Sequence, residues 1–294
     1  MTLLLLACGL LAVTAPGIRP GSMLAAAPRW FVRLSVASVG LGTFAIVAAL
    51  VLSASVGALH LMVGGTVTPA DHLAPEGVVG SAAAAAAILW ILGRSTIMAC
   101  RAVRGHRAAR VDAWLGEHQR AGDLEVVVIP TDAAVAFNVP GRRPQIVISE
   151  GLRSRLSADA LRFVLDHERA HLRGRDRRSA LVATALETVF VFVPGAARTA
   201  AALRVGLERA ADEHAAGAQI ARRRTIVQGI AAEGARTACG AELWHFRSRN
   251  LVDAPPPALP DLSLAASGVA ALAAVGVSVA VHASADFTPY LALL

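Results

Sequence analysis

Long uncharged runs divide the chain into blocks that predict membrane-spanning helices. No charged residue occurs from Leu34 to Leu59, from Gly77 to Gly93 or from Leu262 to Ala285. A helix needs about 20 apolar residues to cross a bilayer core, and Arg94 can extend its charge to the water where the second run ends. The amino-terminal run TLLLLACGLLAVTAP is shorter, and it lacks the basic residues that begin a signal peptide. We interpret it as a short first span.

Between the uncharged runs at 77–93 and 262–285 the sequence is no longer continuously apolar. This region is the size of one domain. Residues 101–122 predict a basic helix that leaves the membrane. Three β-rich runs then predict strands, with turn residues at 140–144 between the last two. The strands are expected at 124–130, 134–139 and 145–149.

Helices follow the strands. Ser157 is a suitable N-cap, and Gly174 a suitable stop, for a helix over 158–173. The apolar stretch 180–193 is interrupted by a glutamate and followed by a proline, so it predicts a buried or membrane-grazing helix rather than a span. Further helices are expected at 198–221 and 221–234, before a proline-rich linker at 251–261.

These elements predict an α+β, mostly helical integral membrane protein with four transmembrane helices. Three spans are expected within residues 1–100, a cytosolic domain at 101–261, and the fourth span with a short external tail at 262–294. The domain therefore lies between spans three and four.

Composition agrees with a membrane protein: 55% of the residues are hydrophobic, and the mean hydropathy is +0.55. Every basic residue is an arginine, and the arginines cluster beside the apolar runs without a stacking-aromatic motif. The net charge of +7 therefore fits membrane orientation better than direct nucleic-acid binding. Cys8, Cys100 and Cys239 form no CxxC pair, which argues against a disulfide framework or a cysteine zinc site.

The arginines also predict which side of the membrane each segment occupies. Arg19, Arg29 and Arg33 follow the first span, and four more arginines follow the third, whereas the loop at 60–76 has none. Cytoplasmic loops carry the excess of basic residues. The domain is therefore expected in the cytoplasm of a multi-pass cell-membrane protein, with both termini outside.

The stretch LDHERAHLRGRD, from Leu165 to Asp176, carries the pattern H-E-x-x-H on a predicted helix. His167 and His171 are four residues apart, so they share one helix face and can bind one metal ion. Glu168 lies one step around the helix, where it can act as general base on a water at that metal. The alternative is a charged helix that matches by chance, but a solvated face would not account for the two histidines. The pattern predicts a catalytic zinc site.

A catalytic zinc site needs a third protein ligand and an open position. Glu208 and Asp212 are also four residues apart, so one can bind metal while the other accepts the N–H of a ligating histidine. The alternative is a surface helix in which they pair with Arg204 and Arg209. Spacing alone also leaves open other downstream ligands: Glu187, Glu213 and His214.

The run AFNVPGRRPQIVISEGLRSRLSADALRFVLDHERAHLRGRD, with LERAAD further on, resembles the BlaR/MecR-type membrane zinc metallopeptidases of bacteria. It is similar, more distantly, to the HtpX and CAAX-prenyl protease group. Both are gluzincins, in which the glutamate of an E-x-x-x-D motif completes HExxH. The resemblance implies a gluzincin-type domain with one Zn²⁺ per chain on His167, His171 and Glu208. It also implies Glu168 as the catalytic base and Asp212 as the partner that orients a histidine.

The resemblance implies a zinc metalloendopeptidase that cleaves a cytosolic protein in regulatory proteolysis, either a transcriptional repressor or the enzyme itself. The alternatives are an HtpX-like quality-control protease and a non-enzymatic signalling scaffold with a structural zinc. Charges on the 158–173 helix argue against an intramembrane protease. BlaR and MecR have a penicillin-binding sensor after the last span, where about ten residues follow here. We therefore expect no β-lactam sensing by this chain.

The run AVAFNV is a candidate edge strand, in which Ala136, Phe137 and Asn138 would pair with an extended substrate. An ordinary internal strand is the alternative. The only tyrosine, Tyr290, falls in the predicted external tail. The side chain that stabilises a reaction oxyanion is therefore expected to be His214, His245 or an arginine.

Overall fold

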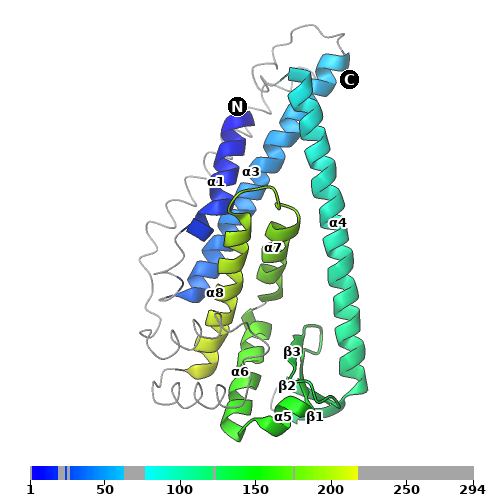
Figure 1. The fold of residues 1–294 in the computed structure, drawn as a ribbon, viewed down its shortest axis with the longest axis vertical. Helices are drawn as coiled ribbons and strands as arrows, with labels where there is room; N and C mark the ends of the chain where they lie inside the picture. The colour runs from blue at the N-terminus through cyan, green and yellow to red at the C-terminus, as the bar shows by residue number, and fades with distance from the viewer. Residues whose placement is uncertain are drawn as a thin grey trace.

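The computed structural model describes residues 2–18, 24, 27–62, 77–121, 124–174 and 176–217. Three long helices run along the longest axis of the molecule, and a small sheet lies at one end (Figure 1). The long helices are α1 (Thr2–Ile18), α3 (Pro28–Met62) and α4 (Gly77–Leu115).

Helices α3 and α4 are long and apolar enough to cross a membrane, and α1 is a shorter apolar helix. The predicted fourth span, Leu262–Ala285, lies outside the described residues. Helix α4 continues well past the uncharged run and carries its basic end to the sheet (Figure 1). The chain is thus mostly helical, with two candidate membrane helices in its described part.

Helices α1 and α3 approach closely because small residues lie where they cross. A Cβ atom placed on Gly9 would lie only 2.8 Å from the carbonyl oxygen of Gly42. Small residues at such crossings allow helix backbones to pack closely in membranes. Either glycine replaced by a larger residue would therefore push the two helices apart.

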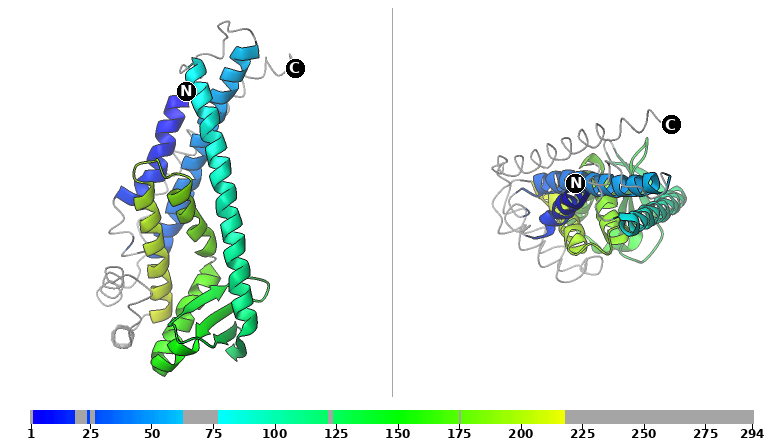
Figure 2. Two further views of the ribbon diagram at one scale, coloured as in Figure 1. Left: turned by 45° about the vertical axis from the view of Figure 1, so that its right-hand side comes forward. Right: turned by 90° about the horizontal axis from the view of Figure 1, so that it is seen from above.

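Helices α7 (Asp176–Thr188) and α8 (Ala196–Ala216) form a hairpin that runs from the sheet end alongside the long helices (Figures 1 and 2). Its far end is tied to them: Thr199 Oγ1 donates to the carbonyl of Val13 at 3.0 Å, and Trp90 Nε1 donates to that of Val189 at 3.1 Å. Helix α7 ends five residues before the predicted limit at residue 193. The apolar stretch 180–193 packs against the long helices, as predicted for a buried or membrane-grazing segment.

The four strands form one mixed sheet in the order β1-β2-β4-β3. Strands β2 and β4 are parallel, and the outer pairs are antiparallel. The strands are β1 (Glu117–Ala121), β2 (Leu124–Ile129), β3 (Ala136–Val139) and β4 (Gln145–Ser149). The three predicted strands are confirmed, and β3 lies at an edge.

The prediction that 101–122 is helical throughout is wrong after Leu115. Residues 117–121 pair antiparallel with β2, with Ala121 opposite Leu124. Their polar side chains suit an exposed edge strand, and the main-chain bonds to β2 outweigh the local helical pattern.

The sheet lies between the end of α4 and helix α6 (Ala158–Gly174), with the short α5 (Glu150–Arg155) leading into α6. On one face, Ile146 and Ile148 pack against α6 through Leu165. On the other face, Val127 and Val147 pack around Ala113 of α4. The alternation of a strand thus divides the sheet into an α6 face and an α4 face.

Helix α6 begins and ends as its sequence predicts. The hydroxyl of Ser157 accepts from the backbone N–H of Ala160 at 3.3 Å, and the helix stops at Gly174. With one side of α6 on the sheet, the opposite side faces α8, where His167 and Ala170 are buried. This arrangement positions the H-E-x-x-H motif against the second acidic motif.

Candidate metal centre

Three side chains from α6 and α8 converge on one point. The Nε2 atoms of His167 and His171 are 3.1 Å apart, and the carboxylate of Glu208 lies 3.4 Å from the first and 3.8 Å from the second. One ligand atom from each residue fits within a 4.8 Å span. The four-residue spacing on α6 and the packing of α8 across it bring together the three predicted ligands.

A carboxylate faces the outer nitrogen of each histidine. Asp212 Oδ1 lies 2.9 Å from Nδ1 of His167, and Asp176 Oδ2 lies 2.8 Å from Nδ1 of His171. Ionised carboxylates only accept hydrogen bonds, so Nδ1 of His171 is the donor to Asp176. Asp212 lies within ion-pair distance of Nδ1 of His167, and the same tautomer would place a proton between them. In the neutral tautomers the Nε2 lone pairs then point toward each other and toward Glu208. Two imidazole lone pairs and a carboxylate directed at one point are suitable ligands for a cation.

The two arginines of α8 that could pair with the predicted site residues pair with other glutamates. Arg204 pairs with Glu187 at 2.7 Å, and the fully buried Arg209 pairs with Glu213 at 2.7 Å. Glu208 and Asp212 instead contact His167. The geometry therefore disfavours the alternative of a salt-bridged surface helix, and Glu187 and Glu213 belong to different clusters.

Glu168 is connected to the edge of the sheet. Asn138 Nδ2 on β3 donates to Glu168 Oε2 at 2.8 Å, which fixes one carboxylate oxygen and leaves the other for a different partner. Glu168 therefore follows His167 directly in the chain, and its side chain reaches an edge strand. Of the three residues proposed for substrate binding, Asn138 contacts the site, while Phe137 packs on the α4 face.

A protein-family model described as BlaR1 peptidase M56 matches residues 45–225, more than half of the chain. The chain belongs to the BlaR1 peptidase M56 family. No curated protein and no solved structure matches it. Membership makes the chain a metallopeptidase by family, and the match includes both candidate membrane helices in part or whole and all of the converging side chains.

The carboxylates around His167 show why this group of residues fits a metal ion. Burial alone would lower the pKa of His167, but the carboxylates of Asp212 and Glu208 overcome this and raise the pKa to about 10. The metal-free imidazole therefore holds a proton at neutral pH, so the site already stabilises one positive charge. A metal ion must displace that proton, and metal affinity is expected to fall as the pH falls.

Asp176 was not identified from the sequence, although it ends the quoted LDHERAHLRGRD stretch. Its position in the sequence could have indicated this role, because it follows His171 by five residues and comes just after the glycine that ends α6. Asp176 is in the first turn of α7, and its carboxylate lies 2.8 Å from Nδ1 of His171, near the end of α6. Such partners orient the imidazole and fix its tautomer.

We expect Asp176→Asn to weaken zinc binding about 10- to 100-fold, because the amide can still accept a hydrogen bond but no longer carries the charge. Metal titration of the purified protein measures this change. Asp159→Asn is the control, since Asp159 also lies in the first turn of a helix but is exposed. Equal affinities for the two variants would show that Asp176 does not orient His171.

The oxyanion-stabilising residue stays a prediction. His214 lies on α8 outside the group of converging ligands. Burial, Arg29 and Arg173 lower its pKa, so its imidazole is a poorer cation than an ordinary histidine. His245 lies outside the described residues.

Proposed function

We propose that this chain is a membrane-embedded zinc endopeptidase that cleaves a cytosolic protein in regulatory proteolysis. The observation that carries the proposal is the convergence of His167, His171 and Glu208, with Glu168 next to His167 in the chain and bonded to Asn138. In this assignment the first three hold one zinc ion, and Asp212 and Asp176 orient the histidines. Glu168 is the catalytic base.

When bound, zinc supplies Lewis-acid chemistry that polarises the peptide carbonyl and makes water more acidic. Glu168 takes the proton of the attacking water through its free carboxylate oxygen and delivers it to the leaving amine. Asn138 holds the other oxygen at 2.8 Å, so the base keeps one orientation through both transfers. Burial of His167 and its carboxylate partner keeps the ligand set rigid.

Strand β3 offers the substrate a backbone template. It is at the end of the strand order, so one side of its main chain has no strand partner within the described residues. An extended peptide can add to such an edge, and main-chain bonds give affinity without a demand for particular side chains. Ala136, Phe137 and Asn138 would then align the peptide next to Glu168.

The expected substrate is a single regulatory protein, with a transcriptional repressor as the leading class. Its identity can be tested by comparing new protein amino termini in host cells that express the wild type or Glu168→Gln. A regulator should yield one or a few cytosolic cleavage products that are absent from the variant. Many membrane-protein products would instead indicate an HtpX-like quality-control protease, and none would support a scaffold with a structural zinc.

We also propose that the sheet and the metal centre face the cytoplasm. The end of α4 that reaches the sheet is rich in arginine, and such residues are retained on the cytoplasmic side. The amino terminus and the tail at the other end of the chain would then be external.

Thiol labelling tests this orientation in a variant whose three cysteines are replaced by serine. A cysteine at Ala74 should react with an impermeant maleimide in intact cells, because it lies in the arginine-free loop. A cysteine at Arg142, which is exposed near the sheet, should react only after lysis. The opposite labelling would place the metal centre outside the cell.

A further inference from the structure

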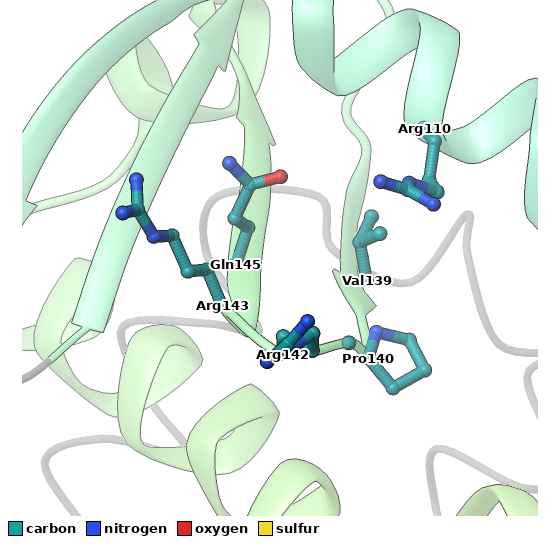
Figure 3. Close-up of a pocket in the computed structure, with 7 residues that line it drawn as sticks. Arg110, Val139, Pro140, Arg142, Arg143 and Gln145 are labelled. Atoms are coloured by element: carbon teal, nitrogen blue, oxygen red, sulfur yellow. The ribbon is translucent and has the colours of Figure 1, made fainter.

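A basic pocket lies where the sheet meets the end of α4 (Figure 3). Its volume is about 710 Å³, and it lies between α4 and the turn from β3 to β4. The lining residues are Arg110, Val139, Pro140, Gly141, Arg142, Arg143 and Gln145. Neither the catalytic proposal nor the family match assigns a role to this pocket.

Three arginines and no carboxylate line the pocket, so it carries positive charge, although Glu125 is near enough to Arg143 for their charges to interact. Arg110, Arg142 and Arg143 pair with no carboxylate in the described part of the chain. The carboxylate of Glu125 is engaged by Gln145 and His118 at 2.8 Å each. Hydrogen bonds from these two residues, with the charge of Arg143, lower the pKa of Glu125. The three arginines that line this hollow favour an anion, and a guanidinium group binds a carboxylate in a two-pronged geometry.

The pocket is continuous with the edge strand that leads to the metal centre. Val139 is the last residue of β3 and packs on the α4 face of the sheet, whereas Asn138 contacts Glu168 on α6. Side chains of a peptide paired with β3 would also alternate between these faces. One face would point toward the metal centre and the other toward Arg110 and the turn.

A lipid headgroup fits this place less well. Arg94 marks the end of the uncharged run, and Arg110 follows sixteen residues later on the same helix. At 1.5 Å per residue the separation is about 24 Å. The headgroup layer extends only about 5–8 Å beyond the hydrocarbon core.

We propose that this pocket binds the carboxylate of an aspartate or glutamate in the substrate polypeptide, within about five residues of the cleaved bond. The distance follows from a strand rise of about 3.3 Å per residue between Asn138 and the turn. This inference rests on the proposed peptidase function and adds a substrate class to it. The pocket is a specificity site on the α4 face, separate from the catalytic base.

Cleavage of a proteome-derived peptide library by the purified full-length protein tests the preference. Cleavage sites should be enriched in acidic residues at a position within five residues of the cut. For a peptide pair that differs only by Glu or Gln there, kcat/KM should differ about tenfold, as for a hydrogen bond to a charged group. Arg142→Gln with Arg143→Gln should remove the difference, and Arg107→Gln with Arg120→Gln, two exposed arginines outside the pocket, should keep it.

Binding provides a second measurement that does not require proteolysis. In the Glu168→Gln background, a fluorescein-labelled decapeptide with three glutamates should bind about tenfold more tightly than its glutamine counterpart. The Arg142→Gln and Arg143→Gln pair should abolish this preference. Tighter binding of the glutamate decapeptide, together with no cleavage of any peptide by the wild-type protein, would support the pocket and contradict the peptidase proposal.

Cleavage without acidic enrichment, or enrichment that survives in the pocket variants, would overturn the inference while leaving the peptidase intact. Equal binding of both decapeptides would also overturn it. Competition by short-chain phosphatidylglycerol, together with no preference for the glutamate peptide, would assign the pocket to lipid headgroups instead.

Discussion

Glu168→Gln is expected to fold, insert and bind zinc normally while losing proteolysis about 100- to 10,000-fold. Loss of a positioned general acid–base group typically has this size. Glutamine keeps the shape of the side chain and can still accept from Asn138 through its amide oxygen, but it cannot take a proton at neutral pH. The measurement is kcat/KM on a protein substrate, with zinc content determined on the same preparation.

Glu150→Gln is the matched control, because Glu150 is an exposed glutamate at the start of α5 that forms only a weak pair with Arg153 at 3.6 Å. Its activity should equal the wild type. A Glu168→Gln protein that cleaves its substrate at the wild-type rate would refute the proposed mechanism. The histidine helix would then hold a structural metal at most.

Glu208→Ala should lower zinc affinity by more than the 10- to 100-fold expected for residues that only orient a ligand. Its carboxylate lies 3.4 Å from Nε2 of His167 and 3.8 Å from that of His171, so its loss leaves two nitrogen donors. Zinc bound per chain after gel filtration, and competition with a chelator, measure the loss. Far-ultraviolet circular dichroism shows whether the helices persist.

The structure dictates which glutamate serves as the control in that experiment. Glu213→Ala is unsuitable, because it would remove the partner of the fully buried Arg209, and an unpaired buried charge costs about 3–5 kcal/mol. Glu187→Ala loses only an exposed pair with Arg204, which contributes about 0–1 kcal/mol. Zinc loss in Glu187→Ala equal to that in Glu208→Ala would refute the third-ligand assignment.

The sequence predicts the candidate ligands because helical spacing is a local property. The four-residue separation of His167 from His171, and of Glu208 from Asp212, follows from 3.6 residues per turn. The N-cap at Ser157 and the stop at Gly174 are likewise local, and the structure has them where they were predicted. The family resemblance drawn from these stretches is confirmed by the M56 match.

The sequence by itself determined the apolar blocks that form α3 and α4, and it determined three of the strands. It also determined the limits of α6 and the helix face on which each motif lies. Only the tertiary structure decided that α8 crosses α6 with Glu208 at the histidine pair, that Asp176 turns back to His171, and that β3 is an edge strand beside a basic pocket. It also replaced the end of a predicted helix by β1. The physical reason is that spacing fixes neighbours within one helix or strand, whereas contacts between elements depend on packing and strand pairing across long stretches of chain.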